Sequence, residues 1–576
     1  MDTEAGSVPH DAVSACQVAE HDVVFLLDFP CVQDKHLPKI DALKTDTIDT
    51  GGALGILHPD QRDTELRVQP LFQLGALDLS TDLHPSVRAA LDDRGAKEPP
   101  KTLPCRSLTD GGKRLLNGEL ARPPGDPRKH SGYVSGRGLA MLLPSGSRER
   151  IRGAGGPDQP FLRLEVEALH LLSFGSETGL AMLSLRVVLP RDVPVRLAQI
   201  EEVLHVLSNT TRHRTLGWAC EEKPEGRFTL LELVEGILSS AGCGSTPWNR
   251  LFTVTYAQLT APPITDGAED GLAMAAWRLS RHYTGAYRPG PDHRAGSVIA
   301  RPFDDIVHAT SMEGAATLTV PATAFLRDAF ADRMRSCYLP LAVLAFHEHV
   351  RLLDMAQRAA GALAGAARVA VLSASGRSST GTPGDIAQLE ALRWLVDGFL
   401  SFRLRYRLTV VSDITMHNQF YAALRAALQL EALTQKLSGD TADAARALQD
   451  SRTRVAAARG RVLHDAHLRR ERGRAWILGL FAGLLTFLTS LAALKEVQEV
   501  LKHHVHGGPG WLFNLASPAA LAAALGVVSG IVTARRHRDA HSHDEDEDED
   551  EIGQELAADL RGESVHVASE VPVAER

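Results

Sequence analysis

Three histidines stand close together towards the end of the chain: His503, His504 and His506. Neutral imidazole nitrogens are ligands that Zn²⁺ and similar borderline metals accept. The trio lies beside Gly507 and Gly508, in a stretch expected to be a short loop. Two interpretations follow from the spacing alone, a loose metal site or a solvated loop.

A second group combines small and hydroxyl side chains within an uncharged run: Gly479, Gly483, Thr486 and Ser490. Steps of four, three and four residues place all four on one face of a helix. Such a stripe fits a close helix–helix contact, and it equally fits the wetted lining of an oligomeric pore. Gly526 and Gly530 repeat the G-x-x-x-G spacing later, where small residues let two membrane helices pack closely.

Known catalytic motifs are missing from the sequence. It has no G-x-x-x-x-G-K-[ST] and no G-x-S-x-G. The stretch "FHEHV" places His347 and His349 two residues apart, which is not H-E-x-x-H, and predicts core or surface histidines. We therefore expect no enzyme and no cofactor, with Mg²⁺ or Zn²⁺ entering only as a transported or regulatory ion.

Composition limits the compartment and the partners. The net charge is −9, and the run "DEDEDEDE" at 544–551 carries eight of those negative charges, so the rest is nearly neutral. Without a basic field, nucleic acid is not an expected partner. The six cysteines are scattered without a C-x-x-C pair, which favours a reducing compartment. Ala-, Arg- and Gly-rich usage is typical of a bacterium with GC-rich DNA.

Two long uncharged runs predict two membrane spans. Residues 475–494 and 511–534 each carry no charge over roughly 20 residues, the length needed to cross about 30 Å of hydrocarbon. Arginines precede the first run (Arg469, Arg470, Arg472, Arg474) and follow the second (Arg535, Arg536, Arg538). The positive-inside rule puts both groups in the cytoplasm and only residues 495–510 outside. The expected protein is a multi-pass protein of the inner or plasma membrane with both termini cytoplasmic.

Alternating and helical patterns predict an α+β domain ahead of these spans. "FLRLEVEALHLLSF" and "LAMLSLRVVL" form a hairpin, a helix follows with Leu197, Ile200 and Leu204 on one side, and "LFTVTYAQL" returns as a strand. This order suggests a ferredoxin-like or related sandwich. "TLLE" from Thr229 matches a capping box at a helix start.

The predicted organisation has six parts: an α/β segment at 1–92, a Pro/Gly-rich insertion or linker at 93–160, the α+β domain at 161–312, a helical stalk at 313–474, the two transmembrane helices at 475–534, and a basic then acidic disordered tail at 535–576. Ser438-Gly439-Asp440 predicts a turn in the stalk, and from Thr441 a helix runs on into the first span. Leu448, Val455 and Val462 recur every seven residues, a coiled-coil signal.

This arrangement resembles the CorA-type metal-ion transporters over roughly residues 161–538. The resemblance implies a homo-oligomer, by family a pentamer, whose first span lines the pore with Gly479, Gly483, Thr486 and Ser490. The Gly-Met-Asn signature that closes the first span in that family is lacking; "LAALKEVQEVLKHHVHGGPGWLFN" stands there instead.

The sequence thus predicts a CorA-like divalent-cation channel or transporter with a large cytoplasmic regulatory domain. A second class stays open, namely a membrane-anchored sensor, or a membrane-disrupting effector of a bacterial conflict system. In that case the N-terminal region would bind protein partners.

Overall fold

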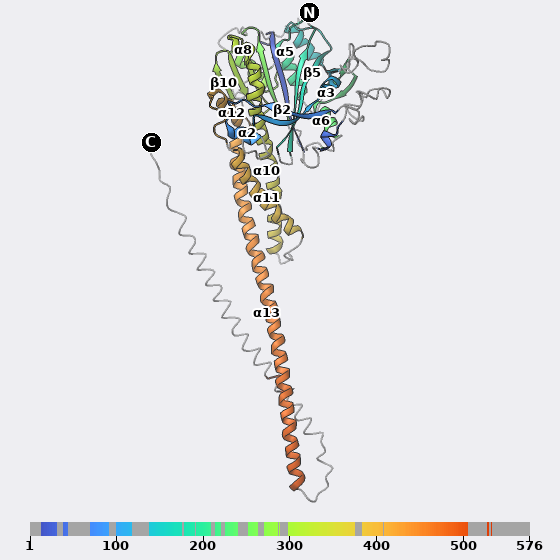
Figure 1. The fold of residues 1–576 in the computed structure, drawn as a ribbon, viewed down its shortest axis with the longest axis vertical. Coiled ribbons are helices and arrows are strands. Elements are labelled where there is room, and N and C mark those ends of the chain that lie inside the picture. The colour runs from blue at the N-terminus through green and yellow to red at the C-terminus, as the bar shows by residue number, and fades with distance from the viewer. Residues whose placement is uncertain are drawn as a thin grey trace, which may run out of the picture. The chain divides into compact units, whose positions relative to one another are not determined.

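The fold is taken from a computed structural model of the chain (Figure 1). The structure describes residues 13–30, 38–43, 70–91, 100–117, 138–174, 178–190, 192–208, 214–219, 225–239, 243, 251–262, 270–285, 287, 298–374, 383–406, 408–504, 527–528 and 531–532. The chain divides into two units, Met1–Leu448 and Gln449–Arg576. Each is described by itself.

One large sheet organises the first unit. Its twelve described strands are β1 (Val18–Pro30), β2 (Phe72–Asp78), β3 (Thr102–Leu108), β4 (Gly138–Leu142), β5 (Phe161–Ser173), β6 (Thr178–Val188), β7 (Leu216–Ala219), β8 (Glu225–Phe228), β9 (Leu251–Leu259), β10 (Val298–Phe303), β11 (Ile306–Thr310) and β12 (Gly314–Thr319). Ten follow the order β10-β11-β12-β9-β1-β6-β5-β4-β7-β8, β3 pairs with β2 and β5, and β12 runs parallel to β9. The sheet is therefore mixed.

Helices cover both faces of the sheet. The first face is covered by α3 (Asp110–Leu116), α4 (Ser145–Gly153), α5 (Leu197–Leu207), α6 (Leu230–Ser239) and α7 (Gly271–Ser280). The second face is covered by α2 (Pro85–Leu91), α8 (Ala324–Asp328), α9 (Phe330–Arg333), the π-helix η3 (Met334–Tyr338), α10 (Leu339–Ala374), α11 (Pro383–Tyr406), α12 (Thr415–Ala427) and the start of α13 (Leu430–His504).

Strand β1 shows why the core has two halves. Val23, Phe25 and Leu27 lie in the first hydrophobic cluster, whereas Val24 and Leu26 lie in the second. Successive side chains of a strand point to opposite faces, so a central strand that is apolar on both sides must be covered on both. The run "VVFLLDF" is central because it pairs with β6 along one edge and β9 along the other, and the two hydrophobic clusters cover its two faces.

The hairpin, the helix after it and the returning strand are confirmed as β5–β6, α5 and β9. The capping box is confirmed too, because Glu232 N–H donates to Thr229 Oγ1 (3.1 Å) and Thr229 N–H donates to Glu232 Oε2 (2.8 Å). The sheet, however, is much larger than a ferredoxin-like unit.

The expected division at residues 92 and 160 is not seen in the sheet. Strands β1 and β2 come from the predicted N-terminal segment, and β3 and β4 come from the predicted linker, yet all four belong to the same sheet as β5. Pro104 lies in β3 opposite Ala76 of β2. The pairing of β3 with β5 covers only Arg106 and Ser107, so a residue without an N–H is tolerated at position 104.

The predicted turn at Ser438–Asp440 is wrong, because α13 continues through it. A Cβ atom on Gly439 would meet nothing within 4 Å, so this glycine lies on an open side of the helix. An exposed helical glycine costs about 1 kcal/mol. Leu437 and Ala444 on either side are fully buried in the second cluster, and that packing outweighs the local cost.

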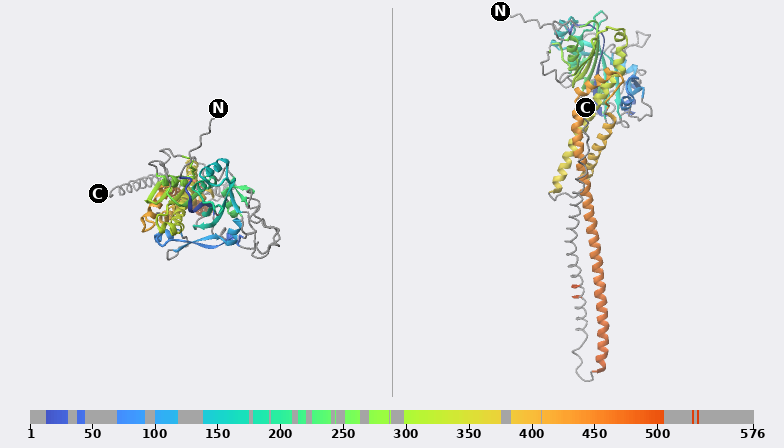
Figure 2. Two further views of the ribbon diagram at one scale, coloured as in Figure 1. Left: turned by 90° about the horizontal axis from the view of Figure 1, so that it is seen from above. Right: turned by 90° about the vertical axis from the view of Figure 1, so that its left-hand side faces the viewer.

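Pro340 is the second residue of the long helix α10. It has no N–H to donate to the carbonyl of Ser336, four residues earlier. That carbonyl instead accepts the N–H of Ser80 (2.9 Å), which lies just after β2. From this point α10 runs to Ala374, and α11 packs back on it along the first part of α13 (Figure 2).

Candidate functional site: an apolar helix segment and a buried joint

The apolar half of α13 exposes large side chains. By length and composition, one described helix can cross a membrane, Leu463–Ala493 within α13, and its apolar window has no buried part. Trp476, Phe481 and Leu485 expose 67–69% of their surface. A run of exposed large apolar side chains along a helix of this length marks a contact with a membrane or a protein rather than a face in water.

The predicted pore residues all lie in this segment. Thr486 Oγ1 donates to the carbonyl of Ala482 (2.7 Å), so its hydroxyl stays close to the helix backbone. A Cβ atom on Gly479 would meet nothing within 4 Å, which leaves the backbone open to a close neighbour. The lining role of Gly479, Gly483, Thr486 and Ser490 stays a prediction.

The other predicted sites fall at or beyond the end of α13. Gly526, Gly530 and His506 lie outside the described residues, and so does most of the second span. His503 and His504 are the last residues of α13, with side chains outside the description. Within the described part of the chain, no group of three or more His, Cys, Asp or Glu side chains could hold a metal.

A buried polar joint lies where α10, α11 and α12 meet the start of α13. Three consecutive residues of α10, His347, Glu348 and His349, form its centre, and each is at most 9% exposed. His347 Nε2 lies 3.3 Å from the hydroxyl of Tyr406 in α11, and its ring stacks on Phe174 at 4.0 Å. Burial lowers the pKa of His347 well below its usual range, so the ring is neutral at pH 7.

Glu348 connects α10 to α12. Arg425 Nη1 donates to Glu348 Oε2 (2.7 Å), and the hydroxyl of Tyr421 donates to Glu348 Oε1. Arg425 also donates from Nε to Glu431 in the first turn of α13 (2.9 Å). Burial raises the pKa of Glu348 to about 7, although Arg425 and Tyr421 act in the opposite direction. One arginine therefore bridges a buried carboxylate and an exposed one.

His349 holds the corner between α12 and α13. Its Nδ1–H donates to the carbonyl of Leu428 (3.0 Å), the C-cap of α12. The next residue, Gln429, has φ 53°, a left-handed conformation that only a firmly held corner keeps for a residue other than glycine. The three α10 residues thus fix α11, α12 and the direction in which α13 begins.

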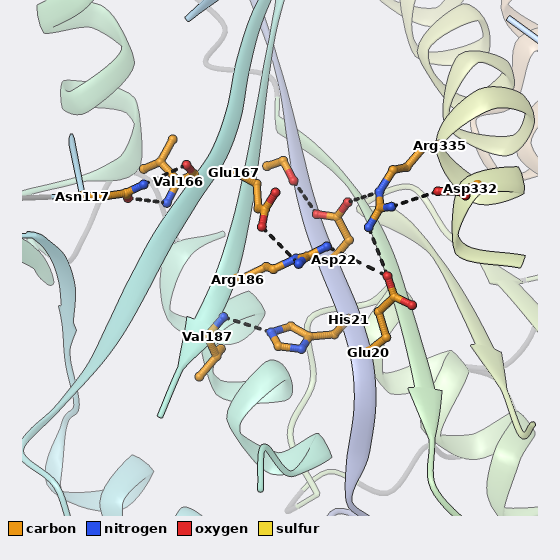
Figure 3. A network of polar contacts seen from close by, with 11 residues as sticks. Glu20, His21, Asp22, Asn117, Val166, Glu167, Arg186, Val187, Asp332 and Arg335 are labelled. Carbon is orange, nitrogen blue, oxygen red and sulfur yellow. Dashed lines mark hydrogen bonds and ion pairs between the residues drawn. The ribbon is translucent and has the colours of Figure 1, made fainter. Parts of the chain in front are cut away.

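A second polar network ties the central strand to the start of this helical layer (Figure 3). Arg335 of η3 donates to Glu20 (3.2 Å) and lies 3.6 Å from Asp22, both in β1. Asp22 accepts a hydrogen bond from Ser184 in β6, and burial raises the pKa of Asp22. Because η3 leads directly into α10, this network fixes the start of the helix that carries the joint.

The flanking contacts of this network lie partly in the sheet and partly in the helical layer. Arg186 pairs with Glu167 across β5 and β6 (3.0 Å), and Asp332 pairs with Arg335 (3.3 Å). His21 Nε2 accepts the N–H of Val187 (2.9 Å), and burial lowers the pKa of His21 to about 4. These contacts stabilise the sheet, and they leave no free ligand set for a metal among the described residues.

The sequence contained a signal for the joint that motif searching missed. Glu348 stands in "LAVLAFHEHVRLL", a mainly apolar run, and its neighbours His347 and His349 are both buried. A charged group at such a position must find a partner, since an unpaired buried charge is very costly. The partner, Arg425, lies 77 residues away, and nothing local identifies it.

Comparison with known proteins adds no relative: no family model, curated protein or solved structure matches this chain. The fold itself defines an α+β domain with a mixed sheet, followed by long helices and, among the described residues, one candidate apolar helix.

Proposed function

We propose that this chain is an integral membrane protein of the CorA-like kind, in which copies assemble around a cation pathway that the cytoplasmic domain controls. The observation that carries the proposal is that α13 is one continuous helix with a buried start and an exposed apolar segment. Its first turns are buried in the domain through Leu430, Leu437 and Ala444. The same helix contains the charge-free stretch 475–494, in which large side chains such as Trp476 and Phe481 are exposed.

A single helix with both properties suits the transmission of a conformational change. Helix α13 has no described break, so a rotation or shift imposed at its first turn is carried along its hydrogen-bonded backbone. The joint at Glu348, His349 and Arg425 sets that first turn. In this proposal the sheet domain acts on the membrane segment by moving the joint.

Assembly of several copies would give the stripe of small and hydroxyl residues a surface other than lipid to face. A lone stripe of Gly479, Gly483, Thr486 and Ser490 would place small and hydroxyl groups against lipid, with the backbone at Gly479 exposed. In a ring the stripes face one another, and the hydroxyl oxygens of Thr486 and Ser490 line a pathway for a hydrated ion. The predicted second span, 511–534, would then pack outside the ring through Gly526 and Gly530.

The test uses purified full-length protein in liposomes that contain a divalent-sensitive dye, beside vesicles loaded with a much larger dye. Entry of divalent cations without loss of the larger dye is expected. Thr486→Leu combined with Ser490→Leu should reduce entry by about tenfold or more, because apolar side chains block and dry the stripe.

The matched control is Thr489→Leu. Thr489 makes the same kind of backbone hydrogen bond, to the carbonyl of Leu485 (3.0 Å), but lies off the stripe by helical spacing. It should leave entry unchanged. An equal loss in both variants would overturn the assignment of the stripe. Leakage of both dyes would instead identify a membrane-disrupting effector, and no entry by an inserted oligomer would identify an anchored sensor.

A further inference from the structure

Exposed arginines precede the apolar stretch of α13 and are unevenly placed around the helix. Arg469, Arg470, Arg472 and Arg474 are all exposed. With 3.6 residues per turn, Arg470 and Arg474 lie one turn apart on the same side. Arg472 lies on the side of the Gly479–Ser490 stripe, roughly opposite to them.

The side marked by Arg470 and Arg474 continues as an apolar line. Steps of three and four residues from Arg474 reach the following exposed side chains: Ile477 (56%), Phe481 (67%), Leu484 (54%) and Leu488 (55%). These positions share one helix face. The face is thus basic at one end and apolar along the rest.

The dimensions of this face match one lipid. From Arg474 to Leu484 the helix rises about 15 Å, which is the hydrocarbon depth of one leaflet. A headgroup beside Arg470 and Arg474 would place its acyl chain along Ile477, Phe481 and Leu484. Two guanidinium groups one turn apart can hold a phosphodiester with charge-assisted hydrogen bonds.

We propose that Arg470, Arg474, Ile477, Phe481, Leu484 and Leu488 form a binding face for an anionic phospholipid, on the side of α13 opposite the stripe of small residues. This inference rests on the proposed function in placing residues 475–494 in the bilayer. It adds the ligand class: a phospholipid whose headgroup carries net negative charge, such as phosphatidylglycerol. The bound headgroup also neutralises positive charge that would otherwise repel cations near the cytoplasmic end of the pathway.

The experiment reads lipid identity at this face. Phe481→Trp places a tryptophan within the apolar line. The fluorescence of this tryptophan is obtained by subtracting the fluorescence of the parent chain. Full-length protein is reconstituted in equal mixtures of phosphatidylglycerol and phosphatidylcholine, with bromine on the acyl chains of one lipid or the other as quencher. Quenching by brominated phosphatidylglycerol should exceed quenching by brominated phosphatidylcholine by about twofold or more, and the excess should shrink between 0.05 and about 1 M salt as screening grows.

Two double variants in the Phe481→Trp background decide which arginines act. R470Q/R474Q should equalise quenching by the two lipids. R469Q/R472Q removes the same charge from other sides of the helix and should keep most of the excess. Equal effects of the two variants would overturn the face in favour of a diffuse electrostatic attraction.

Two further outcomes separate this inference from the proposed function. Equal quenching by both lipids in the Phe481→Trp chain would overturn anionic-lipid recognition while leaving the membrane span intact. No quenching by either lipid would mean that Phe481 is outside the bilayer, which would overturn the proposed function as well.

Discussion

Two buried regions of the domain are built alike: each has a glutamate–arginine pair and a histidine that holds a left-handed corner. In the first region, Glu201 of α5 lies 3.3 Å from Arg278 of α7. One turn along α5, His205 Nδ1–H donates to the carbonyl of His282 (3.0 Å), whose φ is 58°. In the second region, the joint, the same parts come from α10 and α12 and end at Gln429.

The difference lies in what each pair touches next. Glu201 and Arg278 are only 1% and 2% exposed, and Glu201 also accepts hydrogen bonds from Ser14 (2.8 Å) and the N–H of Gly285 (3.2 Å). The pair is sealed inside one core. Arg425 of the joint is 16% exposed and reaches the exposed Glu431 in α13. The first region therefore suits a rigid contact within the core. The second suits a contact that can rearrange and change the start of α13.

The largest effect is expected at the sealed pair. Above pH 8, where Glu201 is ionised, Arg278→Leu leaves this carboxylate buried without its cation and should lower the free energy of unfolding by about 3–5 kcal/mol, measured by chemical denaturation of the full chain in detergent. Adding Glu201→Gln should restore most of the loss, because the uncompensated charge is gone. A double variant as unstable as the single one would show that the contribution of this pair to the free energy of unfolding comes from packing and not from charge.

The pH dependence should separate the two carboxylates. Burial raises the pKa of Glu201 to about 8 and that of Glu348 to about 7, from about 4.5 when unfolded. The folded chain therefore binds protons that the unfolded chain has released, so their contribution to stability is present at low pH and is lost as the pH rises through the folded pKa. Between about pH 4.5 and pH 7 the parent should lose about 1–3 kcal/mol of its free energy of unfolding through Glu348, and Glu348→Gln should abolish this loss. Glu201→Gln should abolish a similar loss that continues up to about pH 8.

The stability of each variant must be compared with that of the parent at every pH, because other buried groups make stability depend on pH in the opposite direction. Burial lowers the pKa of His282 and His308 to about 3, and their contribution is lost as the pH falls below about 6.5. Glu431→Gln, which changes the exposed partner of Arg425, serves as the control. It removes a charge that adds to the raised pKa of Glu348, so it should change the slope in the same direction as Glu348→Gln but by much less. Identical profiles for Glu348→Gln and the parent would contradict the raised pKa.

The same two regions show what the sequence could and could not predict. Local patterns were sufficient for β5, β6, α5 and β9, because alternation and helical spacing reflect which side of each element is buried. They failed for the twelve-stranded sheet, since pairing of β1 with β9 joins residues more than 200 positions apart. Both Glu–Arg pairs were missed for this reason, and the apolar segment of α13 was found because its signal is local.

The smallest effect distinguishes the two corners. His205→Ala and His349→Ala each remove one hydrogen bond to a corner carbonyl and should each lower the free energy of unfolding by about 1 kcal/mol. Hydrogen–deuterium exchange should then differ. His349→Ala is expected to speed exchange at the amides of residues 430–433, where Leu433 N–H donates to the carbonyl of Gln429 (3.0 Å), because the first turn of α13 loses its fixed start. His205→Ala should leave those amides unchanged, since its corner lies in the first core. If both variants speed exchange there equally, the joint has no privileged connection to α13, and the proposed transmission from the joint to residues 475–494 is overturned.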